Sequence, residues 1–300
     1  MTGRRSRSIP LSLVGLATAT LVVGCTAGGE QQTDLTSTPS RSAVTADREL
    51  AEAVPAPIRS AGALTVGTSA PYAPMVVASA DGTLTGFDVD VLSNVAAVLG
   101  LRLDLRQTRF DRILPGVVDH VYDIGSRGFF ATLARQRTVD MVSYFRGGTQ
   151  WAQRAGDSVD PNDACGHTVA AAKGTVQQTV ELPAKSKACE TVGAKPIKIV
   201  AAPTQSDAVR ALQEGGADAM SADSVVVATE VHRSNGALTT AGAVFDSQPY
   251  GFAIAKGAPL GGVLRSAIQL LIDRGVMASI AERWGLNGLI KTSVINGATI

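Results

Sequence analysis

Hydrophobic residues recur along the chain with the spacing of strands and helices from about residue 61 onward. Residues 63–68 (ALTVGT) form an apolar run with β-branched members, which is typical of a buried strand. From 88 to 99 apolar residues fall on one face of a helix, which Gly100 would end. Leucines then alternate with charged residues at 101–106, which predicts a strand with one exposed face. The rest of this half is predicted to add a helix that opens at Phe110 and Asp111 and ends before Tyr122, a short strand and glycine-containing loop, a helix that begins near Thr132, and a strand at 139–145.

A second series of elements follows a glycine-rich stretch at 146–150, which we interpret as a crossover. A tight turn at 173–175 leads into a helix, and residues 217–222 (ADAMSA) predict a strand that ends at Asp223. The other predicted elements are strands at 169–172, 197–200 and 250–255, and helices at 206–214, 225–233, 260–274 and 278–284. Strands that alternate with helices in this way indicate an α/β fold with helices packed on a largely parallel sheet.

The composition excludes some partners without identifying one. The chain has 300 residues, of which 45% are hydrophobic and 18% charged, and its net charge is +1. A chain of this length can bury a large core, as one large domain or two smaller ones. It has no basic surplus of the kind that nucleic-acid binding requires, so no nucleic-acid partner is expected.

The N-terminus reads as an export signal rather than as part of the fold. Three arginines within residues 4–7 precede an apolar stretch at 9–23, which is short and rich in Ala, Thr and Gly for a membrane span. It ends in LVVGC, which resembles a bacterial lipoprotein signal; the alternative is an ordinary signal peptide with a chance cysteine. We expect a signal peptide at 1–24 and a lipidated Cys25 followed by a flexible tether to about residue 60. The protein would then be exported and lipid-anchored on the outer face of the cytoplasmic membrane.

The two other cysteines, Cys165 and Cys189, remain as a pair in an oxidising compartment. A disulfide between them is the favoured interpretation, and two free buried thiols are the alternative. No metal site is expected, because no Cys-x-x-Cys or paired histidine spacing is present and His167 stands alone beside Cys165.

Residues 122–137 (YDIGSRGFFATLARQR) carry the first candidate chemistry. They predict a short strand, a loop and the first turn of a helix that contains Arg135. A helix N-terminus presents free N–H groups, and a guanidinium beside it would bind a carboxylate with two-point geometry. The alternative is that Arg135 and Arg137 form a solvated helix face.

From Ala61 to Leu286 the chain resembles the family 3 extracellular solute-binding proteins, the amino-acid-binding components of ABC importers. The matching segments, in the family's order, are LTVGTSAPYAP, GTLTGFDVDV, FDRILPGV, YDIG with TLARQR, VDMVSYF, AAAKGTVQQT, ADAMSADS, YGFAIAKG and GVMASIAERWG. The resemblance implies a type II periplasmic-binding-protein-like fold, in which two α/β lobes are joined by two crossover strands. It places lobe 1 at 61–146 and 247–290, lobe 2 at 147–246 and a C-terminal tail at 291–300.

The resemblance also implies the roles of the charged residues in the cleft. Arg135 matches the arginine that binds the ligand α-carboxylate, and Asp223 matches the carboxylate that takes the α-ammonium. Asp223 alternatively caps the helix that follows it, and it could do both. Thr175 and Val176 match a turn whose N–H groups and hydroxyl help to bind the carboxylate from lobe 2.

Four further positions are assigned to the cleft by the same resemblance. Tyr72 and Phe110 match positions that pack on the aliphatic part of the ligand, with packing in the lobe core as the alternative. Gly128 matches a backbone position in the cleft, and Thr132 matches the start of the arginine-bearing turn.

The chain departs from the family between residues 127 and 130, where small hydroxyl residues are usual. Phe130 removes a hydroxyl donor and narrows the pocket. Arg127, if it faces the cleft, adds a second positive group, and we hypothesise that it selects an acidic ligand such as glutamate or aspartate. The alternative is that Arg127 points to solvent.

The resemblance implies a monomeric binding protein, without a cofactor, that closes on its ligand by hinge motion and delivers it to a membrane permease. The ATPase would be a separate protein, because the chain has no phosphate-binding loop. One alternative is a sensor that presents its ligand to a receptor or kinase. Another is an enzyme like cyclohexadienyl dehydratase on the same fold; it is disfavoured because the three histidines, His120, His167 and His232, lie in no matched motif.

Overall fold

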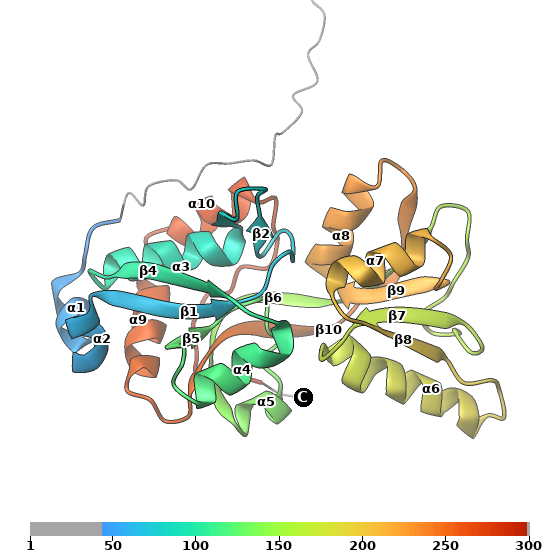
Figure 1. Cartoon of the computed structure of the whole chain (residues 1–300), viewed down its shortest axis with the longest axis horizontal. Coiled ribbons are helices and arrows are strands. Elements are labelled where there is room, and N and C mark those ends of the chain that lie inside the picture. Colours follow the sequence, from blue (N-terminus) through green and yellow to red (C-terminus); the bar gives the residue numbers. More distant parts are fainter. Residues whose placement is uncertain (1–43, 299–300) are drawn as a thin grey trace, which may run out of the picture. The chain divides into compact units, whose positions relative to one another are not determined.

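The computed structural model describes residues 44–298. They form two α/β lobes on one eight-stranded sheet with the strand order β4-β1-β5-β10-β6-β9-β7-β8 (Figure 1). The predicted type II fold is therefore confirmed. The predicted signal peptide and lipidated Cys25 lie outside the described residues. Within the described part of the chain, no helix has the length and apolar character needed to cross a membrane.

Lobe 1, on the left of Figure 1, is built around the parallel strands β1, β4 and β5. Its strands are β1 (Ala63–Thr68), β2 (Val77–Ala78), β3 (Leu84–Thr85), β4 (Arg102–Gln107) and β5 (Ile124–Gly125). Its helices are α1 (Arg48–Ala53), α2 (Ala56–Ala61), α3 (Phe87–Val98), α4 (Phe110–Val118), α5 (Leu133–Gln136), α9 (Leu260–Asp273) and α10 (Val276–Arg283). Helix α3 packs against β4, α9 and α10, and its hydrophobic face is buried as its sequence predicts.

Lobe 2 repeats this plan with β7 (Thr168–Ala172), β8 (Lys198–Ala202) and β9 (Ala219–Asp223), of which β7 pairs in parallel with both others. Its helices are the π-helical turn η1 (Gln177–Glu181), α6 (Leu182–Thr191), α7 (Gln205–Gln213) and α8 (Ser224–Arg233). A disulfide joins Cys165, in the loop before β7, to Cys189 on α6, as predicted. It closes a stretch that contains β7 and the turn leading into η1.

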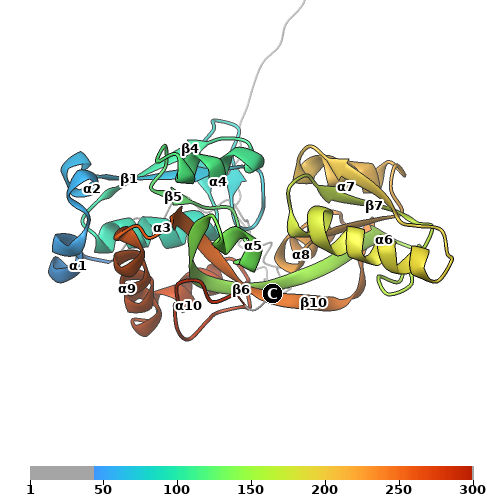
Figure 2. The ribbon, with the colours of Figure 1, turned by 90° about the horizontal axis from the view of Figure 1, so that it is seen from below.

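Two long strands, β6 (Val139–Arg154) and β10 (Leu238–Ala255), run from one lobe to the other (Figure 2). The sequence predicts only 139–145 and 250–255, since Gly147, Gly148 and the polar residues before Tyr250 resemble loops. The strands continue because they pair with each other antiparallel, from Leu238 with Arg154 to Ala255 with Val139, with shifts of register between. This ladder provides the two predicted crossover strands.

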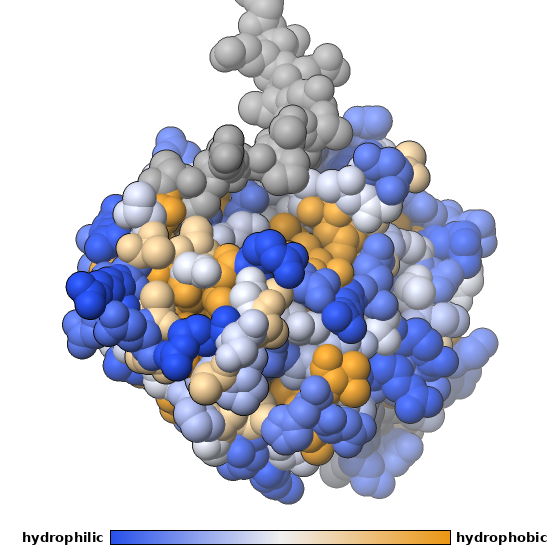
Figure 3. All heavy atoms as spheres, turned by 60° about the vertical axis from the view of Figure 1, so that its left-hand side comes forward, coloured by the Kyte–Doolittle hydropathy of each residue, from blue (hydrophilic) through white to orange (hydrophobic). Residues whose placement is uncertain are grey.

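The segment assigned to the tether is corrected at its C-terminal end. Residues 48–53 and 56–61 form helices α1 and α2, which were not predicted from the sequence. Asp47 caps α1, its backbone N–H donates to the Val98 carbonyl at 2.8 Å, and Val54 is 2% exposed. These two helices are too short to show a helical repeat of apolar residues in the sequence. Packing on lobe 1 stabilises them, because helices of this length are not stable on their own. Figure 3 shows this side of lobe 1, where hydrophobic residues lie in separate areas between hydrophilic ones.

The residues beyond 290, predicted as a tail, also contact lobe 1. The Ser293 hydroxyl donates to the Ser143 carbonyl at 2.7 Å, and the Val294 N–H donates to the Ser143 hydroxyl at 2.9 Å. This segment therefore packs along β6, where Ile295 forms a bridge with Val142.

Candidate functional site

Nine of the ten predicted cleft residues surround one small cavity between the lobes. Lobe 1 and lobe 2 both contribute to it, and the lining residues are Tyr72, Phe110, Arg127, Gly128, Phe130, Arg135, Thr175, Val176, Gln177 and Asp223. We call this the inner cavity. Thr132 is not among its lining residues; it caps α5, and its hydroxyl accepts from the Arg135 N–H at 3.2 Å. Gln177 was not predicted from the sequence as a lining residue, although it directly follows the predicted turn at Thr175 and Val176.

Arg135 lies in the single turn of α5, and its guanidinium is directed into the inner cavity rather than to solvent. Its Nη1 donates to the Phe130 carbonyl at 2.9 Å, and the guanidinium carbon lies 5.0 Å from the centre of the Phe129 ring. Burial lowers the pKa of Arg135 to about 10, although the Asp223 carboxylate opposes this shift. The side chain is therefore cationic at neutral pH, and the other donors of its fork are available for a carboxylate.

Asp223 is the anionic group that lines the inner cavity. It ends β9 and occupies the N-cap position of α8, but its side chain makes no capping hydrogen bond. Instead it accepts from Gln177 Nε2 and from the Tyr250 hydroxyl, both at 2.9 Å. Burial raises the pKa of Asp223, and these hydrogen bonds oppose that shift. The bond from Tyr250 links the lobes, because Tyr250 lies on the lobe 1 half of β10.

Arg127 faces the cleft and is only 4% exposed, so the alternative that it points to solvent is wrong. Its guanidinium carbon lies 3.5 Å from the centre of the Tyr72 ring and 4.4 Å from that of Phe110. Burial lowers its pKa, and the nearby Tyr72 and Asp223 oppose the shift. Its Nε has no hydrogen-bond partner among residues 44–298.

The loop that presents Arg127 is fixed by a buried carboxylate beneath it. Asp88, at the start of α3, accepts from the Ser126 hydroxyl and the Gly128 N–H at 2.9 Å each, and from the Tyr144 hydroxyl at 2.6 Å. Burial raises the pKa of Asp88 to about 6, and these hydrogen bonds and Arg127 oppose the shift. Gly128 has a φ of +56°, and a Cβ there would lie 3.1 Å from the Tyr72 ring. A glycine is therefore required where the loop turns beside the ring.

Phe130 and Phe110 form apolar walls of the cavity. Phe130 is 2% exposed and packs against Tyr250 with ring centres 5.0 Å apart. Phe110 stacks on Phe129 at 5.0 Å, so it combines the two roles that the sequence left open, core packing and lining the cleft.

Thr175 and Val176 line the cavity at the start of η1, but the polar groups of Thr175 have local partners. Its N–H and its hydroxyl both donate to the Ala172 carbonyl, at 3.2 and 2.7 Å. Any ligand carboxylate reached from this turn would thus compete with these bonds.

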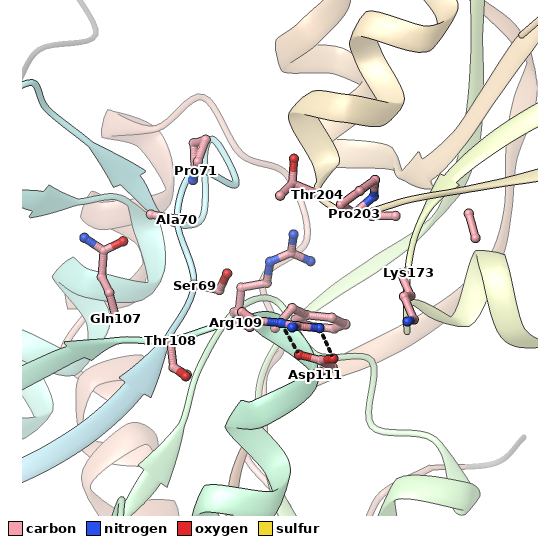
Figure 4. A pocket seen from close by; sticks show the side chains of 14 residues that line it. Ser69, Ala70, Pro71, Gln107, Thr108, Arg109, Asp111, Lys173, Pro203 and Thr204 are labelled. Atoms are coloured by element: carbon pink, nitrogen blue, oxygen red, sulfur yellow. Dashed lines mark hydrogen bonds and ion pairs between the residues drawn. The ribbon is translucent and has the colours of Figure 1, made fainter. Parts of the chain in front are cut away.

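A larger outer cavity of about 760 Å³ opens beside the inner one (Figure 4). It is bounded by the 69–71 and 107–111 segments of lobe 1 and by Lys173, Pro203 and Thr204 of lobe 2. In Figure 4, Arg109 is held by its ion pair to Asp111, at 2.6 Å. Phe110 and Arg127 line both cavities and so form the wall between them.

The inner cavity itself measures about 10 Å³, which is roughly the space of one water molecule. The lobes approach each other closely beside it, since a Cβ added to Gly174 of lobe 2 would lie only 3.6 Å from the Phe110 ring of lobe 1. An amino acid can enter only if the lobes separate or side chains move. Two guanidinium groups, of Arg127 and Arg135, and one carboxylate, of Asp223, line this space.

The histidines do not belong to the site. None of His120, His167 and His232 lines either cavity. His167 lies 3.5 Å from Asp218 on the far side of lobe 2. The cavities therefore contain no imidazole to act as an acid or base.

Comparison with known proteins identifies relatives of this arrangement. The family model of the bacterial extracellular solute-binding proteins, family 3, matches residues 64–287. The chain is 35% identical over 251 residues to the arginine-binding protein ArgT of Corynebacterium glutamicum, covering 83% of each chain. An ancestral arginine-binding protein bound to arginine superposes with a TM-score of 0.68 at 26% identity, covering 74% of this chain and 98% of that one. A mutant of ArgBP from T. maritima gives 0.67 at 28% identity, covering 76% and 97%.

Proposed function

Because this chain belongs to the bacterial extracellular solute-binding proteins of family 3, we propose that it is the substrate-binding lipoprotein of an ABC importer for an acidic amino acid. Cys25 would anchor it to the outer face of the cytoplasmic membrane. It would act as a monomer and deliver glutamate or aspartate to a membrane permease. No cofactor or metal enters the proposal.

Arg135 and Asp223 support binding of the amino-acid backbone. A free amino acid is zwitterionic, and removing both charges from water is costly unless both are paired. Arg135 on lobe 1 would bind the α-carboxylate, and Asp223 on lobe 2 the α-ammonium. Each lobe offers half of the partners, so ligand favours closure through its differential affinity for the closed state.

The position of Arg127 in the inner cavity is the observation that supports a ligand with an acidic side chain. Two of the residues lining the inner cavity are cations and one is an anion. A ligand with one net negative charge complements this balance, whereas arginine, the ligand of the named relatives, would add a third cation. A buried guanidinium favours a carboxylate partner because the fork can bind it in two places.

The binding function is tested by calorimetric titration of the purified protein with glutamate, aspartate, arginine and lysine. We expect tight binding of an acidic amino acid. Arg135→Ala should abolish detectable binding while circular dichroism shows an intact fold. Arg137→Ala, an exposed neighbour in the same segment, should bind as the parent does. Unchanged affinity in Arg135→Ala would remove that residue from the site, and tighter binding of lysine than of glutamate would contradict the acidic ligand.

A sensor that presents its ligand to a receptor would use the same cleft, and the two roles differ only in the partner. A dehydratase-like enzyme would need an acid or base in the cleft, where the chain offers carboxylates but no histidine. Absence of turnover on cyclic acids, together with binding of an amino acid, would separate the proposed role from this one.

A further inference from the structure

The guanidinium of Arg127 lies against two aromatic faces, those of Tyr72 and Phe110, at 3.5 and 4.4 Å. Aromatic faces placed around a cation are a general device for holding quaternary ammonium, methyl-lysine and guanidinium groups, because the ring quadrupole attracts positive charge. Both rings line the inner cavity. The protein therefore contains a binding place for a cation, and its own side chain fills that place.

The charge of Arg127 is poorly compensated within the described residues. Its Nε has no hydrogen-bond partner in residues 44–298, and none of its atoms forms an ion pair there. The nearest carboxylates are committed elsewhere: Asp223 to Gln177 and Tyr250, and Asp88 to three donors below the loop. A buried cation without an anionic partner is costly, so the site favours a ligand that brings an anion.

We propose that Arg127 is a specificity-determining residue that excludes cationic side chains by occupying the aromatic place they would take, and that it admits an anionic side chain as its own partner. An arginine or lysine ligand would have to displace this guanidinium from the rings and then remain beside a like charge. A glutamate or aspartate side chain leaves it in place and pairs with it. The inference rests on the proposed amino-acid binding at Arg135 and Asp223.

A small residue at position 127 tests both parts of the proposal. Loss of exclusion should strengthen the binding of a cationic amino acid, and loss of attraction should weaken the binding of an acidic one. Arg127→Ser removes the guanidinium and frees the two ring faces. Arginine binding should then become at least tenfold tighter than in the parent, and glutamate binding at least tenfold weaker. Arg109→Ser is the matched control, since Arg109 is exposed, pairs with Asp111 and lines only the outer cavity; it should leave both affinities unchanged.

The measurement is calorimetric titration of parent, Arg127→Ser and Arg109→Ser with arginine and glutamate, with thermal unfolding as a check of the fold. Arg127→Ala serves the same purpose if the serine variant does not fold. Unchanged arginine affinity in Arg127→Ser would overturn the inference while leaving amino-acid binding intact. Equal binding of arginine and glutamate by the parent would do the same. If neither the parent nor the variants bind arginine or glutamate, the proposed function itself is wrong.

Discussion

At the scale of single residues, the position of a buried charge in the site depends on a second buried charge that lines neither cavity. Asp88 lines neither cavity, yet its three hydrogen bonds fix the Ser126–Gly128 loop and thereby the place of Arg127. A carboxylate with three donors is well satisfied, but burial still raises its pKa. Such a residue is missed by a search for cleft ligands, because the sequence shows only an acidic residue at a helix start.

The raised pKa of Asp88 predicts a pH dependence of stability. Burial moves it from the ordinary 3.8 to about 6, so the folded state binds the proton more tightly than the unfolded state does. The contribution of Asp88 to the unfolding free energy is thus full below about pH 4 and is lost as the pH rises through 6. A shift of this size corresponds to about 3 kcal/mol.

Urea unfolding between pH 4 and 7 would measure this contribution. Asp88→Asn cannot titrate, so the unfolding free energy of the parent should fall relative to the variant across this range. The comparison is needed because burial also raises the pKa of Asp223 and Glu181. Parallel pH profiles of the two proteins would contradict the assignment to Asp88.

At the scale of elements, the disulfide holds together the part of lobe 2 that reaches the cleft. Cys165 and Cys189 are 24 residues apart, and the stretch between them contains β7 and the turn at Thr175 and Val176. A link over this length restricts the unfolded chain, for which about 3 kcal/mol is typical. Neither cysteine lines a cavity, so the link should act on stability rather than on binding.

Replacing both cysteines by serine, or reducing the bond, should lower the free energy of unfolding by about 3 kcal/mol. Urea unfolding with and without reductant measures the loss, and the serine variant should not respond to reductant. Glutamate titration of the folded variant should give the affinity of the parent. A large loss of affinity at unchanged stability would show that the bond orders the cleft instead.

The elements themselves show what periodicity could and could not predict. Helix α3 and the strands β1, β4, β7 and β9 lie close to their predicted places, because a buried face leaves a clear apolar pattern. The sequence did not predict the lobe 2 halves of β6 and β10, nor the helices α1 and α2. Their order comes from pairing and packing with segments distant in the sequence, which no local pattern records.

At the scale of the whole molecule, the cleft residues were found from the order of matched segments rather than from any one motif. The inner cavity brings together residues that are far apart in the sequence, among them Tyr72, Arg135 and Asp223. They come together because β6 and β10 join the two lobes. The resemblance could place Arg127 but not its orientation. That was decided by Asp88, Tyr72 and Phe110 together, a constellation visible only after folding.

The lobes are already bonded to each other across the cleft, through the Tyr250 hydroxyl of lobe 1 and Asp223 of lobe 2. Tyr250→Phe removes this hydrogen bond but keeps the ring that packs on Phe130. A hydrogen bond to a charged group contributes about 1.5 to 3 kcal/mol, so the ratio of closed to open protein should fall roughly tenfold or more. The Asp223 carboxylate would meanwhile gain capacity for a ligand ammonium.

We therefore expect small-angle scattering of Tyr250→Phe without ligand to give a larger radius of gyration than the parent. Saturating glutamate, the proposed ligand, should bring both proteins to the same value, because its ammonium would pair with Asp223 and favour the closed state. Tyr122→Phe, a lobe 1 tyrosine that lines neither cavity, should behave as the parent does with and without glutamate. If the scattering of Tyr250→Phe coincides with the parent in both states, the bond to Asp223 does not hold the lobes, and closure must depend on contacts such as Phe110 with the Gly174 turn.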